Sequence, residues 1–200
     1  MIRFFDILFS VFGIIILFPF LVVISIIIKI NSSGPVFYKQ KRVGILNSDF
    51  FVWKFRTMKL NADKYGLLTV GGRDPRITSF GFFLRKYKLD ELPQLFNVFS
   101  GSMSLVGPRP EVRTYVSQYS EEQIKILRVR PGITDWASIK YRNENAILEN
   151  SKNPEHDYIH VIMPDKIKYN LIYINNLNIN EYFKIIFYTL FSIIYSKKVK

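Results

Sequence analysis

The chain has 200 residues, enough for one domain with a sizeable core, with or without a membrane anchor. It contains no cysteine, which excludes a disulfide scaffold, a thiol nucleophile and a cysteine-ligated metal centre, and its two histidines leave little for a histidine-rich metal site. Lysine and arginine number 28 against 16 acidic residues, and this net charge of +12 favours anionic partners such as phosphorylated molecules, anionic lipid or nucleic acid.

The N-terminal segment carries the strongest physical signal. Residues 7–28 contain no charge and are interrupted near the middle by Pro19. As a helix this segment would measure ~33 Å, against a hydrocarbon core of ~30 Å. A secretory signal peptide is the alternative, but its apolar region is usually shorter and ends at a cleavage site with small residues. We therefore predict an uncleaved membrane anchor at 1–30 and a folded domain at 31–200. The basic residues after the anchor favour a cytoplasmic location for this domain.

The first elements after the anchor have the composition of β-strands. Residues 36–43 and 50–57 are rich in β-branched and aromatic side chains, and residues 44–49 between them carry turn formers. This pattern predicts a β-hairpin. A polar stretch follows the hairpin and ends at Gly71 and Gly72.

The rest of the chain has mainly helical patterns. Apolar residues recur at helical spacing over 80–87, and a second helix at 91–99 should stop at Gly101. Ser120 and Gln123 have the spacing of a capping box. Two more helices are predicted, one that begins at Pro164 and one over 180–195. The predicted fold class is therefore α+β and mostly helical.

Several of these helices carry wide apolar faces beside lysine. Such a face packs in an ordinary core or lies in the membrane interface with its lysines toward lipid headgroups. For the last helix, where Phe183, Ile186, Phe187, Leu190 and Ile194 recur at spacings of three and four, both interpretations stay open. We predict that this segment adds to membrane association.

Two short motifs could carry chemistry. In LDELPQL (89–95), Pro93 is tolerated only in the first turn of a helix, which places Asp90 at or near the N-cap, where backbone N–H groups suit a phosphate. The simpler interpretation is that Asp90 caps the helix and Glu91 complements its dipole. In the second motif, prolines on both sides of Arg109 restrict the backbone and present the guanidinium. The simpler interpretation there is a surface arginine in a linker.

Taken in order, the motifs are specific. The series FYKQKRVG (37–44), KFRTM (54–58), DPRIT (74–78), LDELPQL (89–95), LVGPRPE (105–111) and PGIT (131–134) runs through the chain. It strongly resembles the bacterial sugar transferases that initiate glycan assembly, the monotopic polyprenyl-phosphate phosphoglycosyl transferases. The resemblance covers nearly the whole chain, and the length is similar to that of members consisting of the catalytic core alone.

The resemblance implies a two-step phosphoglycosyl transfer. A UDP-sugar donates sugar-1-phosphate to undecaprenyl phosphate, giving undecaprenyl-diphosphate-sugar and UMP at the cytoplasmic face of the bacterial inner membrane. The family's nucleophilic aspartate corresponds to Asp90, and its glutamate, which supports Mg²⁺ binding, corresponds to Glu91. We take Asp90 and Glu91 as the candidate metal site. Candidate residues for binding substrate phosphate are Arg85, Arg109, Arg42 and Arg130.

The resemblance also implies that the anchor is a re-entrant helix, broken at Pro19. Relatives have a serine before this proline, and here the residue is Phe18. Other departures are Ser102 in place of an acidic residue and Lys140-Tyr141 in place of Asn-Gly. Asp135 and Ser138 stand where Gly and Gln are frequent, and together with Lys140-Tyr141 they could line the sugar or uridine pocket.

A second class of function is also open: a catalytically inactive membrane-bound scaffold, or a basic binding protein. A nucleic-acid-binding protein should carry a basic stripe within a recognisable reading module, and no such module is evident in the sequence. An inactive scaffold is expected to lose Asp90, Glu91 or Arg109, and all three are present. We therefore expect the partners to be UDP-sugar, undecaprenyl phosphate and bilayer lipid, with no nucleic acid and with homo-oligomer formation left open.

Overall fold

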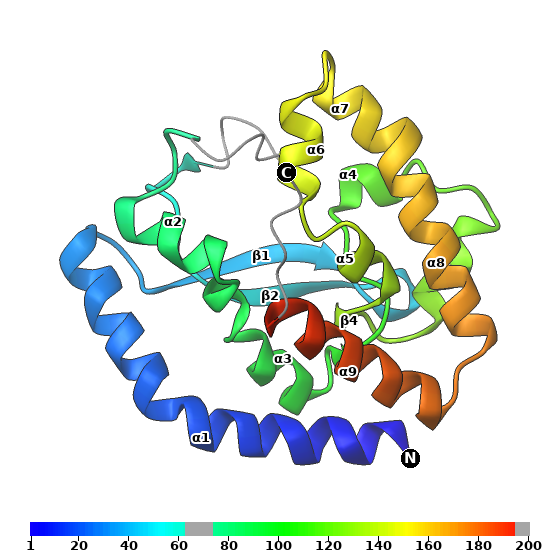
Figure 1. Cartoon of the computed structure of the whole chain (residues 1–200), viewed down its shortest axis with the longest axis horizontal. Helices are drawn as coiled ribbons and strands as arrows, with labels where there is room; N and C mark the ends of the chain where they lie inside the picture. The colour runs from blue at the N-terminus through cyan, green and yellow to red at the C-terminus, as the bar shows by residue number, and fades with distance from the viewer. Residues whose placement is uncertain (63–73, 195–200) are drawn as a thin grey trace.

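The computed structural model describes residues 1–62 and 74–194, with side chains as far as 192. Within these ranges the chain is mostly helical and has a small β component of two two-stranded sheets (Figure 1). The predicted polar stretch that ends at Gly71 and Gly72 lies outside the described residues, as does the tail from 195 onward.

Helix α1 (Ile2–Asn31) is long, apolar and bent. It contains Pro19, whose missing N–H removes one backbone hydrogen bond, and Figure 1 shows the helix changing direction in its middle. By length and composition it is the one described helix that could cross a membrane. Leu21, Ile24 and Ile28 on one face are buried against Phe55 and Leu84, whereas most of its other apolar side chains are exposed. One face of the helix therefore packs against the domain, and most of its other apolar side chains are not covered by described residues.

The predicted hairpin is confirmed. Strands β1 (Phe37–Val43) and β2 (Asp49–Phe55) pair antiparallel, with Phe37 opposite Phe55 and Val43 opposite Asp49. The connecting turn η1 (Ile45–Asn47) is tight because Leu46 and Asn47 adopt left-handed backbone angles, with φ of 53° and 60°.

The helix predicted at 80–87 is confirmed as α2 (Ser79–Lys86), with Thr78 as its N-cap: the Thr78 hydroxyl accepts from the Gly81 N–H. The next prediction is only partly right. Residues Leu89–Glu91 form a separate 3₁₀ turn, η3, and helix α3 (Gln94–Ser100) begins after it and ends at Gly101, whose φ is 91°.

Asp90 is therefore not the N-cap of α3, as the sequence pattern suggested. Pro93 occupies that position, and no side chain caps the helix. The cause lies in the backbone just before, where Lys88 has a left-handed φ of 57° and separates the 3₁₀ turn from α2.

A second, parallel sheet was not predicted. Strand β3 (Ser104–Val106) pairs with β4 (Gly132–Thr134), which brings the LVGPRPE and PGIT motifs side by side. The approach requires glycine, because a Cβ on Gly132 would lie 2.1 Å from the Gly107 nitrogen. Strands of three residues give no periodic signal long enough to recognise in the sequence.

The C-terminal half supplies the helical wall of the fold. The capping box between Ser120 and Gln123 is confirmed, with reciprocal bonds of 2.9 and 3.3 Å, although the element it opens is a 3₁₀ helix. Pro164 lies in the first turn of its helix, as predicted. The elements are α4 (Arg113–Val116), η4 (Gln123–Arg128), α5 (Trp136–Lys140), α6 (Glu144–Glu149), α7 (Pro154–Asp157), the π-helical turn η5 (Tyr158–Ile162), α8 (Met163–Asn175) and α9 (Ile179–Ile194).

Polar contacts fasten both ends of α1 to the rest of the fold. Arg3 donates to the carbonyls of Val98 (2.6 Å) and Phe99 (2.9 Å), near the end of α3. The buried Asp6 carboxylate accepts from the hydroxyls of Ser104 and Tyr182, each at 2.9 Å.

At the other end of α1, the Asn31 amide donates to the Ser79 hydroxyl (2.9 Å), and Arg56 donates to the Ser32 carbonyl (2.7 Å). The start and the end of α1 therefore bind the same folded unit.

Candidate active site

Asp90 lies at the centre of a cluster of charged side chains. It belongs to turn η3, is 9% exposed, and its Oδ1 atom has no hydrogen-bond partner in the described structure. A buried carboxylate oxygen without a partner is costly to keep in a folded protein. It is also free to react or to bind a ligand.

Glu91, the adjacent acid, is fully engaged. The Arg109 guanidinium donates through Nη1 to Oε2 (3.1 Å) and through Nη2 to Oε1, and Lys54 Nζ donates to Oε1 at 3.3 Å. Arg109 thus binds Glu91 as a fork, the geometry that distinguishes arginine from lysine at carboxylates. Lys54 enters from strand β2, and sequence reasoning assigned it no role.

The two acids have opposite electrostatic environments. Burial, together with the neighbouring Glu91 charge, raises the pKa of the Asp90 carboxyl above its ordinary value, and Lys54, Arg85 and Lys88 oppose the rise. Burial also acts to raise the pKa of Glu91, but Arg109 and Lys54 outweigh it and hold that pKa well below its ordinary value. Glu91 is therefore the fixed anion of the pair.

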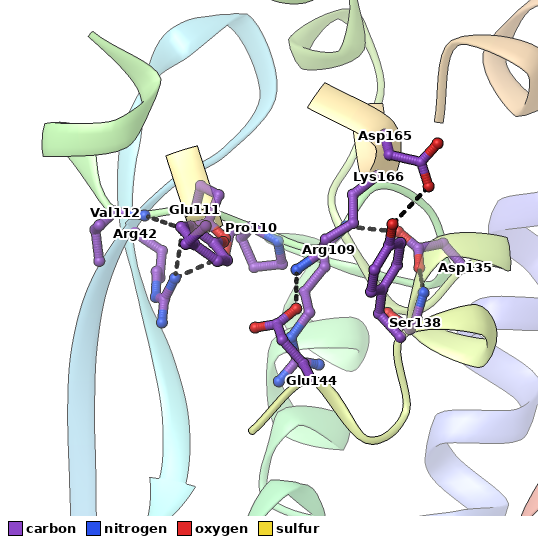
Figure 2. Close-up of polar contacts among 12 residues, drawn as sticks. Arg42, Arg109, Pro110, Glu111, Val112, Asp135, Ser138, Glu144, Asp165 and Lys166 are labelled. Atoms are coloured by element: carbon purple, nitrogen blue, oxygen red, sulfur yellow. Dashed lines mark hydrogen bonds and ion pairs between the residues drawn. The ribbon is translucent and has the colours of Figure 1, made fainter. Parts of the chain in front are cut away.

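The backbone around Arg109 is held from three directions. Pro108 and Pro110 restrict its neighbours, and the parallel pairing of β3 with β4 fixes the segment just before it. The third contact comes from Asp135, which is fully buried and whose Oδ2 accepts from the Arg109 N–H at 3.1 Å (Figure 2). The other oxygen of Asp135 accepts from the Ser138 N–H at 2.5 Å and caps α5.

Asp135 therefore does not line a sugar or uridine pocket, which was one expectation for this departure from related sequences. It is a buried link between α5 and Arg109. The sequence carried no sign of the link, because it depends on the unpredicted β3–β4 pairing.

Of the four arginines predicted to bind phosphate, Arg85 and Arg109 lie close to the acidic pair. Burial lowers the pKa of Arg85, and the nearby charges of Asp90 and Glu91 oppose this by raising it. Arg42 is one step removed: it donates to Glu111 Oε2 (3.2 Å) and to the Pro110 carbonyl (3.1 Å).

Arg130 is not brought into this cluster. Its Nε donates to the Gly101 carbonyl at 3.0 Å, where helix α3 ends, at the opposite end of that helix from the acidic pair. Its contact is with the backbone of the fold.

A small hollow lies beside Lys54 and Arg109, the two cations that bind Glu91. It is lined by Arg42, Val52, Lys54, Gln94, Arg109 and Pro110. Three of these six side chains are cationic, so the hollow has the character of an anion site. Figure 2 shows Arg42 reaching Glu111 from one side and Arg109 on the other side of Pro110.

The chain belongs to the bacterial sugar transferase family, whose model matches residues 1–196. An Aeromonas hydrophila UDP-N-acetylgalactosamine-undecaprenyl-phosphate N-acetylgalactosaminephosphotransferase is 40% identical over 159 residues, which cover 78% of this chain and 38% of the relative. The Escherichia coli K12 UDP-glucose:undecaprenyl-phosphate glucose-1-phosphate transferase is 36% identical over 190 residues, or 93% of this chain and 38% of the relative.

A shorter relative also matches. A putative undecaprenyl-phosphate N-acetylgalactosaminyl 1-phosphate transferase of Bacillus subtilis is 42% identical over 120 residues, 60% of this chain and 67% of the relative. The chain thus spans little more than a third of the two longer relatives. These relatives are named for two different sugars, glucose and N-acetylgalactosamine.

Proposed function

We propose that this chain transfers sugar-1-phosphate from a UDP-sugar to undecaprenyl phosphate and thereby starts assembly of a glycan. The observation that carries the proposal is the unpartnered oxygen of Asp90, buried beside Glu91 and within the influence of Lys54, Arg85 and Lys88. A carboxylate that attacks a negatively charged diphosphate needs neighbouring cations to offset the repulsion between the two anions.

The chemistry proceeds as two displacements at one phosphorus. An Asp90 carboxylate oxygen attacks the sugar-side phosphorus of the UDP-sugar, and the bond to the bridging oxygen breaks, so that UMP leaves with that electron pair. A phosphate oxygen of undecaprenyl phosphate then attacks the same phosphorus and releases the Asp90 carboxylate. Because an ionised carboxylate carries no proton, the first displacement needs no general base.

The cations have separate roles in this scheme. Arg109 and Lys54 neutralise Glu91, so that the acidic pair does not repel the incoming diphosphate. Arg85, on helix α2, interacts electrostatically with Asp90 and Glu91, which supports a role at the same phosphoryl group.

The carboxylates of Asp90 and Glu91 suit a Mg²⁺ ion that they would share with the substrate phosphates. Among the described residues no group of three or more acidic or histidine side chains surrounds a single point. Mg²⁺ is commonly held by one or two carboxylates together with substrate phosphates, and the unpartnered Asp90 oxygen beside Glu91 suits that arrangement. When bound, the ion supplies charge neutralisation of the diphosphate and of the departing UMP.

We also propose that α1 is re-entrant, entering and leaving the membrane on the cytoplasmic face. A straight helix of 30 residues would be about 45 Å long and would leave one end across the bilayer. Here Arg3 and Asp6 at one end and Asn31 at the other all bind the folded domain, which supports both ends lying on one side. The bend at Pro19 supports the same arrangement. Unlike a serine, Phe18 cannot hydrogen-bond the backbone groups that Pro19 leaves unpaired.

Helix α9 is proposed to lie against the same membrane face. Tyr182 and Ile185 are buried in the fold, whereas Phe187 is 65% and Leu190 55% exposed. An apolar face of this kind is typical of a helix in the interface. The side chain of Ile194 lies outside the described residues.

The proposed activity is tested by release of UMP. The full chain in detergent or nanodiscs is given undecaprenyl phosphate, Mg²⁺ and a panel of UDP-sugars that includes UDP-glucose and UDP-N-acetylgalactosamine. With at least one donor we expect repeated release of UMP when the lipid acceptor is present and no more than about one UMP per chain without it. We also expect a loss of turnover on chelation of Mg²⁺. The absence of UMP with every donor would reject the proposed activity.

A further inference from the structure

Helix α3 carries two buried amides one turn apart, and their environments differ. Asn97 is 4% exposed and fully bonded: its Oδ1 accepts from the Trp53 N–H (2.9 Å), and its Nδ2 donates to the Phe51 carbonyl (2.8 Å) and to the Ser102 hydroxyl (3.1 Å). This amide ties α3 to strand β2 and has a complete structural role.

Gln94 is buried still more deeply, at 2% exposed. Among residues 1–62 and 74–194, no hydrogen bond joins its side-chain amide to another protein group, and the amide is not one of the sealed polar groups without a partner. Gln94 instead lines a hollow. An amide that is open to a hollow can exchange its hydrogen bonds with a bound ligand.

The Gln94 amide borders the cationic hollow. The hollow is lined by Gln94 together with Arg42, Lys54 and Arg109. Each of these cations already has a carboxylate partner, Glu111 for Arg42 and Glu91 for the other two. Those ion pairs keep the cations oriented. Beside them, the Gln94 amide is an uncharged hydrogen-bond donor in the lining of the hollow.

We propose that Gln94 contacts the donor substrate, its Nε2–H group donating to a phosphate oxygen of the UDP-sugar in this hollow. The ligand chemistry is that of a phosphoryl anion, which accepts from the amide while Lys54 and Arg109 supply positive charge. Gln94 is four residues after Asp90, so the same short segment offers the attacking oxygen and a hydrogen bond to the group under attack. This inference rests on the proposed function for the identity of the donor.

Binding and stability measurements on the full chain separate this role from a structural one. The probes are UDP, inorganic phosphate and a short polyprenyl phosphate, each titrated by calorimetry, and the melting temperature is measured without ligand. Gln94→Leu should melt at or above the wild-type temperature and bind UDP at least tenfold more weakly. Asn97→Leu is the matched control: it should melt at a lower temperature and, where folded, bind UDP with nearly the wild-type affinity.

Gln94→Glu provides a second variant of the same shape. It should fold and should weaken UDP and phosphate binding further, because a carboxylate would face the phosphoryl anion. Wild-type affinity for UDP in Gln94→Leu or Gln94→Glu would overturn the proposal, as would a loss of folding in both. A weakened affinity for polyprenyl phosphate alone would also overturn it, because it would move Gln94 to the acceptor. UDP binding can be measured even if no UDP-sugar is turned over. Failure of this inference can therefore be distinguished from failure of the proposed activity.

Discussion

The guanidinium of Arg109 donates to both carboxylate oxygens of Glu91, and the two residues, 18 positions apart in the chain, belong to different motifs. This pair decides the charge balance of the site. With Glu91 neutralised by Arg109 and Lys54, the neighbouring Asp90 keeps an unpartnered oxygen available for chemistry.

The fork of Arg109 predicts that lysine cannot replace it. Arg109→Lys keeps one positive charge but loses the second parallel hydrogen bond to Glu91, and we expect turnover to fall about 100-fold with little change in melting temperature. Arg113→Lys is the matched control. Arg113 also donates to a carboxylate, Asp49, at 2.5 Å, but the pair is exposed and remote from Asp90, so turnover should stay near wild type. Equal losses in the two variants would contradict the role given to Arg109.

Asp135 should influence catalysis through the backbone of Arg109. Asp135→Ala removes the cap of α5 and the acceptor for the Arg109 N–H, and we expect a loss of about 1–2 kcal/mol in the free energy of unfolding together with at least tenfold slower turnover. Asn153→Ala removes the cap of α7, another short helix, without a contact to Arg109. It should lose comparable cap stability and keep its turnover. If both variants turned over at the wild-type rate, Asp135 would be a helix cap and nothing more.

The raised pKa of Asp90 predicts how the rate depends on pH. The nucleophile is the ionised carboxylate, so the rate should be constant at high pH and fall as pH drops through the Asp90 pKa, which lies above 3.8. Lys88 lowers that pKa, so Lys88→Gln should move the midpoint to higher pH by a few tenths of a unit, since Lys88 is exposed and screened.

Lys86→Gln serves as the control for this shift. Lys86 is also exposed and lies over the Tyr87 ring, and it is not among the main charges that act on Asp90. A midpoint that moves to lower pH in Lys88→Gln, or by the same amount in both variants, would contradict the electrostatic account.

The fastened ends of α1 predict the side on which the N-terminus lies. Because the chain has no cysteine, Ile2→Cys introduces a single thiol, which can be tested in intact cells with a membrane-impermeant reagent. We expect protection in intact cells and labelling after lysis. Lys29→Cys, near the exposed end of the same helix, should behave identically. Labelling of Ile2→Cys from outside would show that α1 spans the bilayer.

The parts of the fold with long or specific local signals could be predicted from the sequence. The hairpin follows from strand-forming composition on both sides of a turn, α2 from helical spacing, and the capping box at Ser120 from a four-residue motif, all of which act over short distances. The 3₁₀ turn around Asp90 could not be foreseen, because it depends on a left-handed Lys88, a conformation that lysine has no intrinsic preference for.

The active-site contacts needed the tertiary structure. Asp90, Glu91 and Arg109 stand out in their motifs, but Lys54 is one lysine in a strand until strand β2 places it against Glu91. The hold of Asp135 on Arg109 exists only because β3 and β4 pair in parallel across a long separation in sequence. Arg130 shows the reverse case: it directly precedes the PGIT motif, but in the fold its side chain binds the backbone carbonyl of Gly101.

The central claim is that Asp90 forms a covalent bond to the phosphosugar, and intact-protein mass spectrometry tests it most directly. The full chain is incubated with Mg²⁺ and an accepted UDP-sugar in the absence of undecaprenyl phosphate. We predict a mass increase corresponding to one phosphosugar located at Asp90, its discharge on addition of undecaprenyl phosphate, and neither adduct nor turnover in a folded Asp90→Asn variant. Turnover by Asp90→Asn at the wild-type rate, or an adduct on a different residue, would contradict the account.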